Sequence, residues 1–138
     1  MKISLNEALK VAIPYNHSSG DRVTISGKWL RDKAKLDAET KRDLHKLIRG
    51  WQGGGGKLPI FEPKRRVRYD GDKVMMYVIE LKHREPPIHI VVFLSHSNPV
   101  YKTTFNKPNP VGKLFIFDRI IVGYDEYLKY INDVLKSA

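Results

Sequence analysis

Residues 64–94, KRRVRYDGDKVMMYVIELKHREPPIHIVVFL, decide the fold. The first six, KRRVRY, alternate apolar and basic side chains, which is typical of a strand with one polar face. Asp70-Gly71 is a strong signal for a hairpin turn. The runs VMMYVIEL at 74–81 and IHIVVFL at 88–94 are almost continuously apolar, as expected of strands that are covered on both faces. The short connections between these runs predict three adjacent antiparallel strands.

Helices and further strands are predicted on either side of this core. The patterns indicate a helix over 5–12, a short strand over 22–26, helices over 27–36 and 38–50, a strand over 114–122 that bends near Asp118, and a closing helix over 125–135. Asp37 is the expected N-cap of the helix over 38–50. We therefore expect one α+β domain over residues 1–138, in which a mainly antiparallel sheet of four or five strands packs against helices. The glycine-rich stretch 52–57 is predicted to be a flexible loop.

The composition excludes several classes of protein. The chain has 138 residues and no cysteine, so disulfide scaffolds, zinc–cysteine sites and cysteine nucleophiles are ruled out. No stretch approaches the ~20 apolar residues of a membrane span. The first residues lack the long apolar run of a secretory signal, because Glu7 interrupts it. We expect a cytoplasmic protein without a membrane partner.

The formal net charge of +10 is unevenly distributed. Residues 22–49 hold nine basic and four acidic residues, and residues 57–84 hold eight and four. Such a local excess beside aromatic residues indicates a polyanion binder, and we expect nucleic acid, with RNA favoured. The alternative interpretations are a solvated face that keeps the protein soluble, and a surface that binds an acidic protein or a membrane. The candidate nucleic-acid contacts are Lys46 and Arg49 on the helix over 38–50, and Lys64, Arg65, Arg66 and Arg68 on the strand over 64–69.

Three segments between about residues 38 and 101 resemble the RelE/ParE-type toxin family. They are DAETKRDLHKLIRGW, RRVRYDGDKVMMYVIEL and IVVFLSHSNPVYK, which match a basic helix, a hairpin with a glycine-aspartate turn, and a strand followed by a tyrosine. The resemblance implies an mRNA endonuclease that associates with the ribosome and acts without a metal or other cofactor, or a relative that poisons another target. The ribosome, or an acidic inhibitor protein, would then be a partner. Residues 102–138 find no counterpart in this pattern.

The resemblance also implies where the chemistry lies. The family uses Lys and Arg along the strands together with a late Tyr, and the positions that match are the basic residues over 64–68, Lys82, Arg84 and Tyr101. RNA cleavage at the 2′-OH needs a proton acceptor, a proton donor and positive charge near the developing phosphorane. Lys82 and Arg84 would supply the charge, and His83 and Tyr101 are the candidate proton carriers. These four residues are the predicted catalytic set.

Two other functions stay open at the level of sequence. Glu80-Leu81-Lys82 looks like half of the PD-(D/E)xK nuclease motif, in which carboxylates hold Mg²⁺ and the lysine activates water. Its missing carboxylate would come from Glu62, Asp70 or Asp72. The other function is a regulator of phage or mobile-element type, which binds nucleic acid or protein without being an enzyme. Aromatic residues interleaved with basic ones would suit that role.

Overall fold

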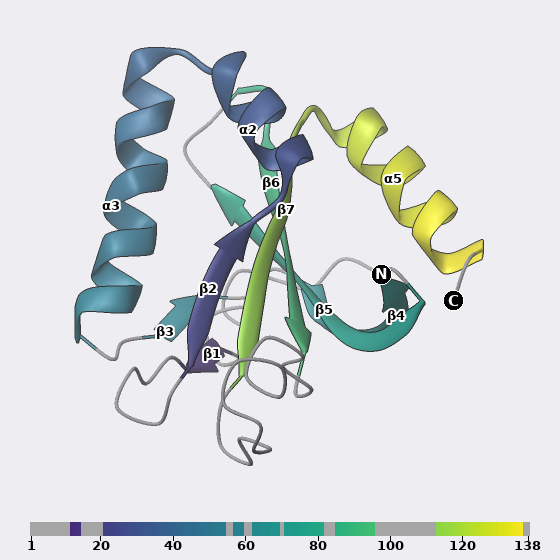
Figure 1. The fold of residues 1–138 in the computed structure, drawn as a ribbon. Coiled ribbons are helices and arrows are strands. Elements are labelled where there is room, and N and C mark those ends of the chain that lie inside the picture. The colour runs from purple at the N-terminus through teal and green to yellow at the C-terminus, as the bar shows by residue number, and fades with distance from the viewer. Residues whose placement is uncertain are drawn as a thin grey trace.

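A computed structural model describes residues 12–14, 21–54, 57–59, 62–69, 71–81, 85–95 and 113–136 (Figure 1). The elements in chain order are β1 (Ala12–Pro14), β2 (Arg22–Ile25), α2 (Gly27–Ala34), α3 (Ala38–Gly54), β3 (Lys57–Pro59), β4 (Glu62–Tyr69), β5 (Asp72–Leu81), β6 (Ile88–Ser95), β7 (Leu114–Val122) and α5 (Tyr124–Lys136). They form one α+β domain with a mainly antiparallel sheet, as predicted.

The sheet has five strands in the order β2-β7-β6-β5-β4. The pairs β4–β5, β5–β6 and β6–β7 are antiparallel, whereas β2 runs parallel to β7. The predicted hairpin is confirmed, because Tyr69 pairs with Asp72 across the turn and Gly71 has a φ of +85°. This left-handed backbone favours glycine, which carries no Cβ. β1 and β3 form a separate pair of short antiparallel strands.

Helices cover both faces of the five-stranded sheet. α2 and α3 lie over one face, and α5 lies over the other (Figure 1). Alternate residues of the central strands therefore enter two different apolar clusters: Ile79 and Ile90 pack towards α2 and α3, while Val78 and Val91 pack towards α5. Burial on both faces explains the continuous apolar runs of β5 and β6.

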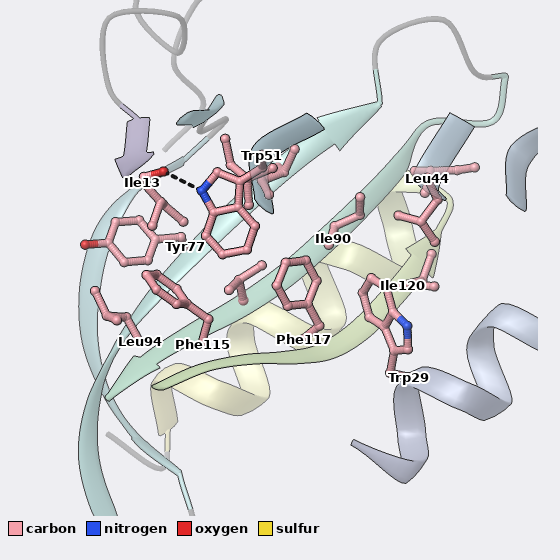
Figure 2. Close-up of a cluster of buried hydrophobic side chains, with 14 residues drawn as sticks. Ile13, Trp29, Leu44, Trp51, Tyr77, Ile90, Leu94, Phe115, Phe117 and Ile120 are labelled. Atoms are coloured by element: carbon pink, nitrogen blue, oxygen red, sulfur yellow. Dashed lines mark hydrogen bonds between the residues drawn. The ribbon is translucent and has the colours of Figure 1, made fainter. Parts of the chain in front are cut away.

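Trp51 of α3 belongs to the apolar cluster between the two helices α2 and α3 and the sheet (Figure 2). Its side chain is 2% exposed, and its Nε1–H donates a hydrogen bond of 3.0 Å to the carbonyl oxygen of Ile13. Its ring meets that of Phe115 edge-on, with centroids 4.9 Å apart. Trp29 of α2 makes a similar edge contact with Phe117, at 5.3 Å. These two tryptophans attach both helices to β7.

Hydrogen bonds of the side chains fix the starts of both helices. Ser26 caps α2, because its Oγ accepts a hydrogen bond of 3.1 Å from the backbone N–H of Trp29. Asp37 caps α3 as predicted, and its Oδ1 accepts a bond of 2.7 Å from the N–H of Thr40. Such caps satisfy N–H groups that have no partner within the helix.

Two predicted boundaries differ from the structure. Residues 1–11, which hold most of the predicted helix over 5–12, lie outside the described residues, but Ala12–Pro14 form a strand instead of a helix end. Pairing with β3 provides backbone hydrogen bonds that the local pattern did not reveal. The helix predicted to end at residue 50 continues to Gly54, so the first glycines of the expected loop are helical. Gly55 and Gly56 lie outside the described residues, and flexibility there remains a prediction.

The predicted bend in the last strand coincides with a β-bulge. Val91 pairs with Arg119, but the next residue, Val92, pairs with Phe117. Asp118 is therefore the extra residue on β7, and such bulges re-aim the side chains around them. No helix among the residues described here is both long and apolar enough to cross a bilayer.

Candidate nucleic-acid interface

The predicted basic strand forms an exposed edge of the sheet. Within the described residues, β4 pairs only with β5. Arg66 and Arg68 are exposed and alternate with Val67, which is buried against the α5 side. Lys73 of β5 lies directly opposite Arg68 and is also exposed. We call Arg66, Arg68 and Lys73 the basic hairpin.

The basic hairpin holds its charges without acidic partners among the described residues. No ion pair joins any of the three side chains to a carboxylate of the described part. Like charges directly opposite each other on two strands destabilise the pair. A phosphate backbone would remove that repulsion, because it places negative charge between the cations. The arrangement suits a polyanion.

Lys64 and Arg65 belong to the same strand. Their backbones lie in β4, where Arg65 pairs with Met76, while their side chains lie outside the described residues. The strand placement predicted for both is confirmed, and their contact with nucleic acid remains a prediction.

Lys46 and Arg49 form a second, separate basic patch. Both are exposed on α3, whose Trp51 packs on the phenylalanine rings of β7. β4 lies three strands away from β7 in the sheet, which corresponds to about 14 Å. Figure 1 shows α3 and β4 at opposite sides of the domain. The structure therefore divides the candidate nucleic-acid contacts between two separate places.

The predicted catalytic residues Lys82, His83, Arg84 and Tyr101 lie outside the described residues. Their positions along the chain are nevertheless bounded: residues 82–84 directly follow the end of β5 at Leu81. β5 runs eight residues from Lys73 to Leu81, or about 27 Å. The expected catalytic segment therefore follows the end of β5 remote from the basic hairpin.

The alternative metal site centres on Glu80. Glu80 is half-buried on β5 and lies opposite the fully buried His89. Asp72 begins the same strand at its far end, too distant to share a metal ion with Glu80. The backbone of Glu62 pairs with Val78, which lies two residues before Glu80 on β5. Asp70 lies outside the described residues, and among those described no three His, Cys, Asp or Glu side chains gather around a common point.

A polar pocket between β4, β7 and α5 was missed by the sequence reasoning. Its volume is about 300 Å³, and its walls include Tyr69, Phe93, Asp118 and Tyr130, with Lys28 and Arg68 among the lining residues. Asp118 is 2% exposed, and its Oδ1 accepts a hydrogen bond of 3.1 Å from the Tyr69 hydroxyl. The available signal was one aspartate inside the apolar run LFIFDRIIV, which we interpreted only as a bend.

A second pocket of about 340 Å³ lies beside the first and shares Tyr130 and Asp133 with it. Asp32 of α2 lines this second pocket and is hydrogen-bonded to β7. One carboxylate oxygen of Asp32 accepts hydrogen bonds from Arg119 Nε at 2.7 Å and from the backbone N–H of Ile120 at 2.9 Å. The carboxylate thus satisfies a backbone donor of β7 beyond the point where β2 ends, and fixes α2 against that strand.

No protein-family model, no curated protein and no solved structure matches this chain. The resemblance to RelE/ParE-type toxins therefore rests on the three sequence segments quoted above.

Tyr130 lines the polar pocket, and its raised pKa keeps the hydroxyl protonated. Burial raises the pKa of Tyr130 well above its usual value, and the negative charge of Asp118 raises it further, while Arg119 opposes this shift. Tyr130 is therefore a hydrogen-bond donor over the whole physiological pH range. It is poorly suited to act as a general base near neutral pH.

The raised pKa predicts how stability changes in alkali. A tyrosine in the unfolded chain loses its proton near pH 10, whereas Tyr130 in the folded protein keeps it. Its contribution to stability is complete below about pH 10 and is lost as the pH rises further. The measurement is urea unfolding at about pH 8 and about pH 10.5 for the wild type and Tyr130→Phe. The wild type should lose more free energy of unfolding over this interval, and equal losses would contradict the assignment.

Proposed function

We propose that the protein binds single-stranded RNA through the basic hairpin and cleaves it with Lys82, His83 and Arg84, which follow β5 in the chain, together with Tyr101, which follows β6. The observation that carries the proposal is the set of exposed cations Arg66, Arg68 and Lys73, which have no acidic partners among the described residues. Arg68 lies directly opposite Lys73, and Arg66 lies two residues before Arg68 on the same face of β4. Clustered Lys and Arg neutralise phosphates and give salt-dependent binding. RNA is favoured over DNA by the likeness to RelE/ParE-type toxins, and because its 2′-OH can act as the internal nucleophile.

The chemistry proposed for this site is metal-independent transfer to the 2′-oxygen. A base removes the proton of the 2′-OH, the oxygen attacks the adjacent phosphorus, and the 5′-oxygen of the next nucleotide leaves with a proton from an acid. We assign the proton carriers to His83 and Tyr101, and the stabilisation of the phosphorane charge to Lys82 and Arg84. The RNA must reach along β5 from the basic hairpin to this segment.

A magnesium-dependent nuclease is the second candidate. The observation in its favour is the register that places the backbone of Glu62 opposite Val78, two residues before Glu80 on the same face of β5. Glu80 and one further carboxylate would bind Mg²⁺, and Lys82 would activate a water molecule. This mechanism needs Glu80, whereas the metal-independent mechanism does not.

Cleavage of end-labelled single-stranded RNA, with Mg²⁺ and with EDTA, tests the two mechanisms. We expect the wild type to cleave in EDTA, Lys82→Ala to lose turnover, and Glu80→Gln to retain it. Lys129→Ala on the exposed side of α5 is the control. Cleavage that requires both Mg²⁺ and Glu80 would transfer the assignment to the second candidate. The same reactions with added ribosomes cover a ribosome-dependent enzyme. RNA binding without turnover in every reaction would contradict both mechanisms and leave a binding regulator.

A further inference from the structure

The polar pocket combines three features in a small volume. Its aromatic wall consists of Tyr69 and Phe93, whose ring centroids lie 4.7 Å apart. Asp118 supplies an almost fully buried carboxylate. Lys28 at the start of α2 and Arg68 at the end of β4 bring positive charge to the lining. At about 300 Å³ the pocket is at the small end of the range for ligand sites, which suits one planar ring system.

We propose that this pocket receives a single guanine base, and that Asp118 recognises it. The base would come from a free guanine nucleotide or from an RNA chain, and the proposal rests on the proposed function only in the second case. Asp118 would accept hydrogen bonds from the N1–H and the 2-amino group of guanine. Tyr69 and Phe93 would provide the stacking surface, as aromatic side chains do for unstacked bases of RNA.

The chemistry of the carboxylate selects the base. An ionised carboxylate only accepts hydrogen bonds, and its two oxygens together offer about four lone-pair positions. One position on Asp118 is occupied by the Tyr69 hydroxyl, which leaves capacity for two more donors. Guanine presents two adjacent donors on one edge, N1–H and the 2-amino group. Adenine and cytosine present one amino donor beside an acceptor, which the carboxylate would repel.

The carboxylate lies at the bulge in β7. Asp118 is the extra residue between two regular pairs, and its side chain lies on the α5 face of the sheet, where the Tyr69 hydroxyl contacts it. Its carbonyl oxygen accepts a hydrogen bond of 2.9 Å from Ser26 Oγ, which ties the bulge to the N-cap of α2. The same residue that caps α2 thereby places Lys28 near Asp118. A buried carboxylate is costly unless it is hydrogen-bonded, and a ligand with two donors would offset that cost.

Titration of the purified protein with GMP, IMP and AMP tests the recognition. IMP has the N1–H but no 2-amino group, and AMP has neither donor in that place. We expect GMP to bind most tightly, and IMP and AMP to bind on the order of tenfold more weakly for a lost hydrogen bond to a charged group. Asp118→Asn should lower GMP affinity on the order of tenfold and remove the difference between GMP and IMP. Equal affinities for the three nucleotides, or no binding of any of them, would overturn the proposal.

A second variant keeps the test decisive if Asp118→Asn fails to fold. Lys28 is exposed, so Lys28→Gln leaves the core intact. We expect this variant to bind GMP several-fold more weakly, because Lys28 meets the phosphate, and to bind guanosine as the wild type does. Lys41→Gln on α3 is the matched control and should leave both affinities unchanged. Equal losses for guanosine and GMP in Lys28→Gln would contradict the placement of the phosphate.

Two RNA oligomers of equal length, with and without one guanine, separate the sources of the base. If the base comes from RNA, the wild type prefers the guanine oligomer, GMP competes with it, and Asp118→Asn loses the preference. If it comes from a free nucleotide, GMP binds while the two oligomers bind equally. A protein that binds GMP but no RNA would retain the pocket and refute the proposed function. Binding of both oligomers without any response to GMP or to Asp118→Asn would refute the pocket alone.

Discussion

Replacement of Trp51 by alanine is expected to lower the free energy of unfolding by about 3–5 kcal/mol. The variant loses a buried ring that contacts both phenylalanines of β7, Phe115 and Phe117. It also loses the hydrogen bond from Nε1 to Ile13, which leaves a buried carbonyl oxygen without its donor. Domains of this size are stable by about 5–15 kcal/mol, so a large part of the total is removed. The contacts through which Trp51 joins α3 to β7 and to β1 should therefore be lost together.

Urea unfolding followed by circular dichroism measures this effect. Trp51→Phe is the intermediate case, because it keeps an aromatic ring in the cluster but has no N–H for Ile13. We expect it to lose less than the alanine variant. Leu128→Ala, at a side chain 42% exposed on α5, is the control and should change stability by less than ~0.5 kcal/mol. A loss below about 1 kcal/mol for Trp51→Ala would mean that α3 is not held by this cluster.

Neutralising the basic hairpin is expected to weaken RNA binding about 100-fold. The triple variant Arg66→Gln, Arg68→Gln and Lys73→Gln removes three phosphate contacts, each worth about 1 kcal/mol at an exposed site. The three side chains are exposed, so the fold should persist. Relief of the repulsion between Arg68 and Lys73 should even stabilise the hairpin slightly. Fluorescence anisotropy with a labelled RNA oligomer provides the affinities.

The control for this variant removes the same charge from a different surface. Arg31→Gln on α2, Lys35→Gln at its C-cap and Lys129→Gln on α5 change three exposed residues. If binding depends on the basic hairpin, this control should weaken affinity only a few-fold through the lower net charge. Equal effects of the two triple variants would show that net charge alone governs binding, and that no particular surface holds the RNA.

The central sheet could be predicted because its signals are local. The Asp70-Gly71 turn and the apolar runs of β5 and β6 determine which strands are neighbours, and the register confirms the pairing. The parallel contact of β2 with β7 joins Arg22 to Leu114, across most of the chain, and no local pattern encodes such a pairing. β1 and β3 have three residues each, too few to show a period.

Part of the candidate site could also be predicted, because the signal for the basic strand is local as well. Alternation along residues 64–69 correctly placed Arg66 and Arg68 on an exposed face. The separation of Lys46 and Arg49 from them depends on which strand α3 packs against, and that choice is made by Trp51 and the rings of β7. The pocket at Asp118 brings together residues from α2, β4, β6, β7 and α5. Its buried carboxylate lies at a bulge of β7, which is visible only once the pairing of β7 with β6 is known.

The dependence of RNA affinity on salt concentration tests the central claim most directly. Each phosphate contact with a single strand contributes about −0.7 to the slope of the logarithm of the binding constant against the logarithm of the salt concentration. The basic hairpin alone therefore predicts a slope of about −2 or steeper for the wild type, and a slope shallower by about 2 for its triple glutamine variant. A flat dependence for the wild type, or the same slope for both proteins, would contradict RNA binding through Arg66, Arg68 and Lys73.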